Sequence, residues 1–212
     1  MFVLASASKA RQKLLNQIDL KYKVIVSDFD ESKVLEANPR LKVKLLAKAK
    51  ADNALKKLIN ENFALNTVQV LLGCDSLFEF EGEVFSKPIS KNQLISRLRR
   101  MSGKSGFLHT GHYLIAIDNL KSDDKSISIN KFIEGVVSTK IEFMSLSNSE
   151  ILKYALTSEP YNCAGGFAME GYGGLFIKKI DGCFSNVIGL SLPWLKTNLE
   201  KCGLSELLLD KQ

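Results

Sequence analysis

Residues 68–76, VQVLLGCDS, carry the strongest sign of a buried strand in the chain. Valines and leucines follow one another without the polar alternation of a half-exposed strand, so both faces of this strand are expected to be covered. Gly73 is predicted to end the run, and Asp75 follows it. Because ligands in open α/β sheets bind outside the carboxyl ends of strands, Asp75 is well placed to hold a divalent metal or to accept a proton from water. A turn or capping aspartate is the alternative interpretation.

Strands and helices are expected to alternate on both sides of this run. Glu81-Gly82 predicts the turn of a hairpin, and Ser147 with Glu150 fits a capping box at the start of a helix that Pro160 closes. The expected strands are residues 1–6, 22–29, 68–76, 112–120 and 131–144, with the hairpin at 78–88. The expected helices are residues 7–18, 40–57, 91–103, 145–160 and 192–202, and the glycine-rich stretch 162–182 is expected to be partly extended. This alternation predicts an α/β fold, in a single domain over residues 1–212 because no repeat or linker divides the chain.

Composition narrows the classes of protein to consider. The 212 residues are 45% hydrophobic and 25% charged, and no apolar run approaches the roughly 20 residues of a membrane span. The first residues lack a basic leader, so a cytoplasmic location without membrane association is expected. The four cysteines form no C-x-x-C pair and are expected to be free thiols. The net charge of +6 comes from scattered lysines, which favours a polyphosphate ligand over a nucleic acid.

The stretch LASASKAR, residues 4–11, joins the first expected strand to the first expected helix. Helix N-termini carry unpaired N–H groups and a partial positive charge, so anions bind there. Hydroxyls of Ser6 and Ser8 could donate to phosphate oxygens, and Arg11 could make a bidentate contact. The alternative is that one serine is only an N-cap and that Arg11 is an ordinary surface residue.

Further charged residues fit the same chemistry. Lys87 stands before Pro88 and offers an ammonium to a phosphate, while Glu31 adds a second carboxylate after the second expected strand. Two carboxylates, two cations and two hydroxyls are what metal-assisted phosphoryl chemistry requires. The spacing of these residues along the chain does not by itself bring them together.

Two other motifs do not predict sites. Gly103-Lys104-Ser105 is not a P-loop, because Leu98 occupies the position of the required glycine and no strand precedes the segment. His109 and His112 are three residues apart on an expected strand and should point to opposite faces, so a shared metal is not expected.

Taken together, these stretches resemble the Maf family of nucleoside triphosphate pyrophosphatases. LASASKAR resembles the family's LASxSPRR opening, and SDFDES at 27–32 resembles its acidic segment. LLAKAKA resembles an LAxxKA helix, which places Lys50 at the family's lysine, and GCDS…GEVFSKP resembles GADT…GxxxGKP. Later matches, in order, are LRRMSG…TG, FMSLSNSEILKYALTSEP, CAGGFAMEGYGG and NVIGLSLPWL. The resemblance covers the chain from Leu4 to about Gly203.

The resemblance implies an elongated α/β protein with a mixed, twisted sheet, a nucleotide cleft between two lobes and, often, a homodimer. It also implies cleavage of a nucleoside triphosphate to a monophosphate and pyrophosphate, with Mg²⁺ or Mn²⁺. Such enzymes remove non-standard nucleotides from the pool, and the family is linked to septum formation. Carried over, Asp75 and Glu31 are catalytic and metal-binding carboxylates and Lys50 and Lys87 are catalytic cations. The expected substrate-binding residues are Ser6, Ser8, Ala10, Arg11, Ser76 and Glu170.

Three of these positions are associated with base choice in the family. CAGGFAMEG, ending in Glu170-Gly171, resembles a subgroup that acts on 7-methyl-GTP, whereas Ser76 resembles the threonine of a subgroup that acts on dTTP and UTP. Ala10 stands where members often have arginine or tryptophan. A glutamate can accept hydrogen bonds from the Watson–Crick donors of guanine, so Glu170 favours a purine-type or modified base.

Other functions stay open at this stage. A nucleotide-binding regulator of cell division with little turnover would use the same cleft, although it would not need Asp75 and both lysines. A nucleic-acid-binding domain rests on the charge alone, and an α/β phosphatase acting on monoesters would give different products. The sequence leaves open whether the expected loop at 121–130 closes over a substrate.

Overall fold

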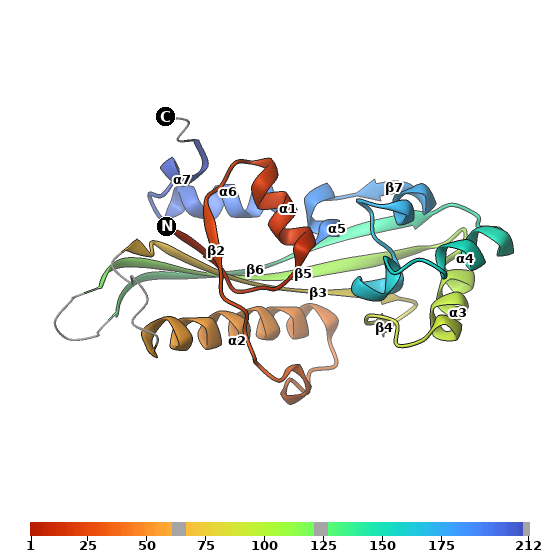
Figure 1. Cartoon of the computed structure of the whole chain (residues 1–212), viewed down its shortest axis with the longest axis horizontal. Coiled ribbons are helices and arrows are strands. Elements are labelled where there is room, and N and C mark those ends of the chain that lie inside the picture. Colours follow the sequence, from red (N-terminus) through yellow and green to blue (C-terminus); the bar gives the residue numbers. More distant parts are fainter. Residues whose placement is uncertain (61–66, 121–126, 210–212) are drawn as a thin grey trace.

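In the part of the chain that the structure describes, a mixed β-sheet of seven strands runs along the length of the molecule, with helices on both faces (Figure 1). The computed structural model describes residues 1–60, 67–120 and 127–209. The strands are β1 (Phe2–Leu4), β2 (Tyr22–Val24), β3 (Val70–Phe80), β4 (Glu83–Phe85), β5 (Ser105–Leu120), β6 (Ile127–Phe143) and β7 (Ile177–Asp181). The α-helices are α1 (Lys9–Gln17), α2 (Pro39–Asn60), α3 (Lys91–Met101), α4 (Asn148–Tyr154), α5 (Phe184–Ile188), α6 (Leu192–Lys201) and α7 (Glu206–Leu209). The predicted α/β fold with a mixed sheet is confirmed.

The two edges of β3 are covered to different extents. The strand order is β2-β1-β3-β5-β6-β7, and β5 pairs antiparallel with β3 from Val70 to Glu79. On the other edge, β1 pairs parallel with β3 only as far as Leu72, and β4 pairs with it only from Phe78. Among the described strands, none therefore pairs with residues 73–77 on that edge. This open edge lies where the parallel strand β1 ends, as expected for a ligand site in an α/β sheet.

The prediction that Gly73 ends the strand is wrong, because β3 continues to Phe80 and Asp75 lies in its middle. The glycine is needed for helix packing instead. A Cβ on Gly73 would lie 2.2 Å from the carbonyl oxygen of Ala47 in α2, and a Cβ on Gly111 would lie 2.1 Å from the carbonyl oxygen of Val43. Both glycines let the backbone of α2 lie directly on β3 and β5.

Successive side chains of β3 serve opposite faces of the sheet. Leu71 packs with Ala47 and Ala51 of α2, whereas Leu72 packs in the cluster that contains Leu14 of α1. Figure 1 shows α2 on one face of the sheet and α1, α5, α6 and α7 on the other. The same alternation sends the side chain of Asp75 toward α2 and that of its neighbour Ser76 toward α1.

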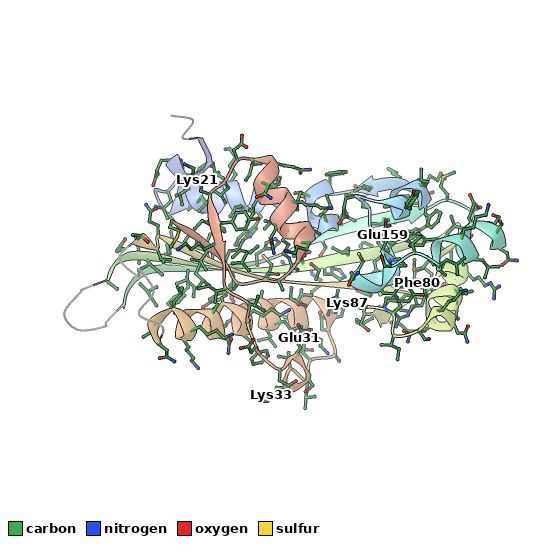
Figure 2. All side chains as sticks on the ribbon, viewed as in Figure 1. Lys21, Glu31, Lys33, Phe80, Lys87 and Glu159 are labelled. Carbon is green, nitrogen blue, oxygen red and sulfur yellow. The ribbon has the colours of Figure 1, made fainter. Side chains whose placement is uncertain are left out.

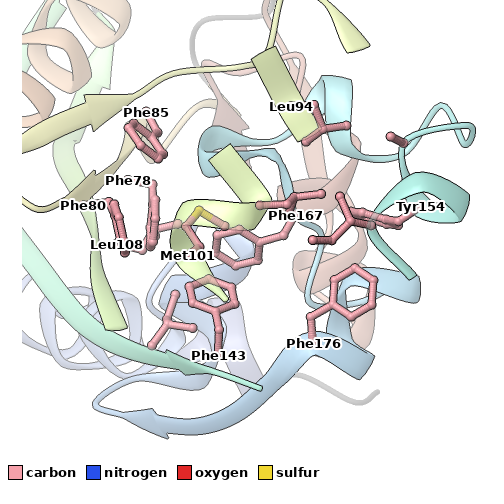
Figure 3. Close-up of a cluster of buried hydrophobic side chains, with 14 of the residues drawn as sticks. Phe78, Phe80, Phe85, Leu94, Met101, Leu108, Phe143, Tyr154, Phe167 and Phe176 are labelled. Carbon is pink, nitrogen blue, oxygen red and sulfur yellow. The ribbon is translucent and has the colours of Figure 1, made fainter. Parts of the chain in front are cut away.

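A cluster of aromatic side chains covers the end of the sheet that carries Phe78 and Phe143 (Figure 3). The rings of Phe78 and Phe143 each meet Phe167 edge to face, with centroids 5.2 and 5.1 Å away. Such pairs contribute about 0.5–1.5 kcal/mol beyond the area that they bury. Phe167 comes from the glycine-rich stretch 162–182, which forms the 3₁₀ turns η4 (Ala164–Gly166) and η5 (Tyr172–Phe176) before β7. The cluster therefore anchors this otherwise irregular stretch to the sheet.

Local signals are confirmed at three places. Ser8 is the N-cap of α1, and its hydroxyl accepts from the backbone N–H of Arg11. Ser147 and Glu150 form the capping box of α4. Glu81 and Gly82 both have positive φ, as the predicted hairpin turn requires.

Several predicted boundaries are wrong. The second strand ends at Val24 because its partner β1 has only three residues. Helix α4 ends at Tyr154, where the backbone bonds tighten to three-residue turns, and Pro160 begins the 3₁₀ turn η3 (Pro160–Asn162). Helices α5 and α7 were not predicted. Of the expected loop at 121–130, residues 127–130 belong to β6, and residues 121–126 lie outside the described residues.

No helix within the described ranges is both long enough and apolar enough to cross a membrane.

Candidate functional site

A pocket of about 890 Å³ lies beside the open edge of β3. Its wall includes Asp75, Ser76 and Leu77 from that edge. All ten residues that were expected at the site line this one pocket: Ser6, Ser8, Ala10, Arg11, Glu31, Lys50, Asp75, Ser76, Lys87 and Glu170. They come from separate parts of the chain, so the fold supplies the convergence that the spacing alone does not.

One lysine joins the two carboxylates at the centre of the pocket. The ammonium of Lys50 lies 2.5 Å from Oδ1 of Asp75 and 2.7 Å from Oε1 of Glu31. Lys50 projects from α2, the helix that the two sheet glycines bring close to β3. Glu31 stands on the 3₁₀ turn η1 (Glu31–Lys33), between β2 and α2 (Figure 2). Both carboxylates therefore face one position, and the ammonium of Lys50 occupies it.

Burial governs the ionisation of Asp75. Only 7% of this residue is exposed, and burial raises the pKa of its carboxyl above the ordinary value of 3.8. The positive charges of Lys50 and Arg11 act in the opposite direction. A carboxylate with a raised pKa is a stronger base than an ordinary aspartate, which suits a proton acceptor.

Arg11 is a buried cation with three hydrogen bonds. Its Nε donates to the carbonyl oxygen of Gly189 at 2.7 Å, Nη1 donates to the hydroxyl of Ser6 at 2.8 Å, and Nη2 donates to the hydroxyl of Ser76 at 3.0 Å. The interpretation of Arg11 as an ordinary surface residue is therefore wrong, because the residue is 7% exposed. A guanidinium has five N–H groups, so one remains on each terminal nitrogen for a ligand.

Exposed lysines flank the pocket. Lys87 follows β4 (Figure 2), and within the described ranges it has no ion-pair partner. Lys9 and Lys13 also line the pocket, although neither residue was predicted there from the sequence. The signal available was their spacing of four residues, which puts both on one side of α1. The pocket thus combines a carboxylate centre with a cationic rim.

Glu159 is a third pocket residue that sequence reasoning missed. It lines the pocket, and its carboxylate accepts from the hydroxyl of Tyr154 at 2.8 Å and from the backbone N–H groups of Tyr172 and Gly173 at 3.0 and 2.9 Å. A Cβ on Gly171 would lie 2.1 Å from this carboxylate. Glu159 therefore holds the glycine-rich stretch in place at the pocket, at a site marked in Figure 2.

The family model described as Maf-like protein matches residues 1–202. The chain belongs to the Maf-like family. A relative from Prochlorococcus marinus strain NATL1A is 79% identical over 211 residues, covering 100% of both chains, and is named nucleoside triphosphate pyrophosphatase. Relatives with the same name from P. marinus strain MIT 9301 and Synechococcus sp. strain CC9605 are 46% and 45% identical. These two alignments cover 94% and 93% of this chain and 99% and 100% of the relatives.

The three residues that the family resemblance associates with base choice all line the pocket. Ala10 and Ser76 line it from α1 and β3, and the exposed Glu170 lines it from the glycine-rich stretch. Cys163 also lines the pocket, but burial and the charge of Glu170 raise the pKa of its thiol to about 12. This cysteine is therefore a protonated wall residue rather than a nucleophile.

The histidines of this Maf-like chain have separate surroundings. His109 contacts Ser138 and Glu79, at 2.8 and 3.0 Å. His112 accepts from the backbone N–H of Ser191 at 3.0 Å and stacks on Trp194. They face opposite sides of β5, as their spacing predicts.

The donor set of the site fits a hard divalent cation. Asp75 and Glu31 offer oxygen ligands toward one position, and Mg²⁺ is commonly held by one or two carboxylates together with substrate phosphates. Among the described residues, no group of three or more His, Cys, Asp or Glu side chains is placed so that it could hold a metal ion.

Proposed function

We propose that this chain is a nucleoside triphosphate pyrophosphatase, which hydrolyses the bond between the α and β phosphates to give a monophosphate and pyrophosphate. The observation that carries the proposal is the convergence of Asp75, Lys50 and Glu31 in one pocket with a cationic rim. The names of the relatives support the same reaction.

The residues of the pocket have distinct roles in this reaction. The cations Arg11, Lys9 and Lys87 bind and orient the triphosphate, whose charge complements theirs. Asp75 accepts a proton from the water that attacks the α phosphorus. The bond from the α phosphorus to the bridging oxygen breaks, and pyrophosphate leaves with its negative charge held by the lysines.

We propose Mg²⁺ or Mn²⁺ as the cofactor, held by Asp75 and Glu31. When bound, such a cation neutralises phosphate charge and lowers the pKa of water. Because Lys50 now occupies the position between the two carboxylates, its ammonium would have to move away when the cation binds. The triphosphate is the natural new partner for that ammonium, so the lysine would move from the carboxylates to the substrate.

We further propose a purine-type or modified base. Glu170 supports this choice, because a carboxylate at the pocket wall can accept the two Watson–Crick N–H donors of guanine. A uracil or thymine edge offers one such donor between two carbonyl oxygens, which a carboxylate repels.

A product assay tests the proposal. The chain is incubated with Mg²⁺ or Mn²⁺ and a panel of common nucleoside triphosphates together with 7-methyl-GTP, dTTP, UTP and 5-methyl-UTP. We expect monophosphate and pyrophosphate in equal amounts, and their loss in Asp75→Asn. The fastest substrate decides whether Glu170 outweighs Ala10 and Ser76 in base choice.

Other outcomes would replace the proposal. Release of inorganic phosphate from monoesters would indicate a phosphatase. Tight nucleotide binding without turnover would indicate the regulator of cell division that uses the same pocket as a sensor.

A further inference from the structure

A line of hydrogen-bonded side chains runs from Arg11 along one face of the sheet, across β3 and β5, to α5. Nη2 of Arg11 donates to Ser76 on β3, whose Oγ lies 2.9 Å from Oγ1 of Thr110 on β5. Ser76 and Thr110 are direct partners in the register of these strands. Thr110 has no exposed surface, and its hydroxyl donates to the carbonyl oxygen of Asn186 in α5 at 3.3 Å. Thr110 is not among the residues that line the pocket, and its hydroxyl is joined to the pocket wall by Ser76.

Given the bond that Thr110 donates to Asn186, the direction of the other hydrogen bonds in this line follows from proton counts. A guanidinium only donates, so Ser76 must accept from Arg11. The carbonyl oxygen of Asn186 only accepts, so the single proton of Thr110 is used there. The contact between the two hydroxyls is then made by the proton of Ser76. The line runs from Arg11 to Ser76 to Thr110 to Asn186, and each hydroxyl donates once.

This direction fixes the chemical character of Ser76 at the pocket wall. Its proton points away from the pocket toward Thr110, and one lone pair is held by Arg11. Ser76 is thus an acceptor that holds the guanidinium rather than a donor to substrate. Together with Ser6 and Gly189, it occupies three of the five N–H groups of Arg11. The two N–H groups that remain lie on different terminal nitrogens, and such a pair can donate to two phosphate oxygens at once.

We infer that Thr110 is a positioning residue for triphosphate binding, because its hydroxyl takes the proton of Ser76 and so keeps Ser76 in the orientation that holds Arg11 in the pocket. The inference rests on the proposed function, since it takes phosphate as the ligand of Arg11. It assigns a role to a buried threonine that touches no substrate.

The test uses Thr110→Val, which keeps the shape of the side chain and removes the hydroxyl, and Thr110→Ser, which restores it. Thr139→Val is a matched control, because Thr139 is also fully buried and bonded to Asn186 but is joined to Cys183 instead of Ser76. Binding of inorganic tripolyphosphate is measured by titration calorimetry, which needs no knowledge of the base. KM and kcat are measured with the fastest triphosphate of the panel.

Loss of one positioning hydrogen bond should weaken tripolyphosphate binding and raise KM about five- to tenfold in Thr110→Val, with kcat within about twofold. Thr110→Ser should bind as the original chain does, and Thr139→Val should lower the melting temperature without changing KM. In a Ser76→Ala background, Thr110→Val should have no further effect on binding, because both changes act through the same contact.

Unchanged binding in Thr110→Val would overturn the inference, as would an equal loss in Thr139→Val or effects that multiply with Ser76→Ala. If the unaltered chain binds tripolyphosphate but turns over no nucleotide, the proposed function fails while the positioning role is still decided by the binding data. If it does neither, both proposals fail.

Discussion

Asp75 and Glu31 share one lysine but differ in almost every other respect. Asp75 lies on the central strand β3, paired across the sheet with Gly111, and its side chain is 10% exposed. Glu31 lies on a short 3₁₀ turn in a connecting segment, and its side chain is 57% exposed. The first carboxylate is held by the fold before any ligand arrives, whereas the second is held mainly by Lys50.

This difference separates two requirements of the site. A buried carboxylate is costly to ionise but offers a strong, fixed proton acceptor. An exposed carboxylate costs the fold little and can follow a ligand as it enters. We therefore expect Asp75 to carry most of the chemistry and Glu31 to adjust it. Substitutions at the two residues and around them test this comparison.

The largest effect is expected from Asp75→Asn. Removal of the proton acceptor should lower kcat by about a thousandfold or more, as is usual for a general base that also binds metal. Product formation with the fastest triphosphate checks this. Activity within about tenfold of the original chain would show that Asp75 does not accept the proton.

The same variant tests what burial costs. Because folding raises the pKa of Asp75, the folded chain binds more protons than the unfolded chain above pH 3.8, and stability falls as pH rises through that window. The ionised carboxylate therefore lowers stability at neutral pH, and Asp75→Asn should melt at an equal or higher temperature there without metal. A lower melting temperature would show that the ion pair with Lys50 stabilises the fold by more than burial of the carboxylate destabilises it.

Lys50→Met is expected to have the next largest effect. It leaves Asp75 and Glu31 facing each other without a cation, which should cost about 3 kcal/mol of stability, as for other broken buried pairs. The same change should tighten Mn²⁺ binding in the absence of nucleotide, and Mn²⁺ should restore the melting temperature. Calorimetric titration with Mn²⁺ and thermal melts check these two effects. Weaker Mn²⁺ binding than in the original chain would contradict a shared cation position.

A smaller effect is expected from Glu31→Gln. Because the side chain is mostly exposed, stability should stay within about 0.5 kcal/mol of the original chain. Turnover should fall about tenfold to a hundredfold, as is typical when a group that assists a metal site is removed. Turnover of the same triphosphate is measured in both variants, and the loss in Glu31→Gln is compared with the loss in Asp75→Asn. An equal loss in the two variants would remove the distinction between them.

The parts of this structure that sequence predicts best depend on neighbours along the chain. The N-cap at Ser8 and the capping box at Ser147 and Glu150 each use residues within three positions of one another, so their patterns are visible directly. The hairpin turn at Glu81-Gly82 is of the same kind. Six of the ten site residues were proposed from their chemistry and four, Ala10, Lys50, Ser76 and Glu170, through the family resemblance, but spacing alone could not have brought them together.

The features that could not be predicted from the sequence depend on contacts between residues far apart in the chain. Gly73 looked like the end of a strand, but its role depends on Ala47, far earlier in the chain, and on the packing of α2. Strand ends were misplaced because the length of a partner strand decides them, as β1 does for β2. Glu159 was missed because its partners include backbone N–H groups, which leave no trace in the sequence.

The smallest effect is expected from Asp30→Ala, which loosens the turn under Glu31. The carboxylate of Asp30 accepts from the backbone N–H and the hydroxyl of Ser32, at 3.1 and 2.7 Å, and caps the turn. Its loss should raise the Mn²⁺ concentration for half-maximal turnover by about two- to fivefold, because a lost cap frees the turn without removing Glu31. Asp28→Ala removes the same charge from the same segment, but Asp28 pairs with Lys57 and does not hold the turn, so it should leave that concentration unchanged. Equal shifts in both variants would mean that the local negative charge, rather than the position of Glu31, sets the Mn²⁺ concentration that turnover requires. The capped turn would then not be needed to place Glu31.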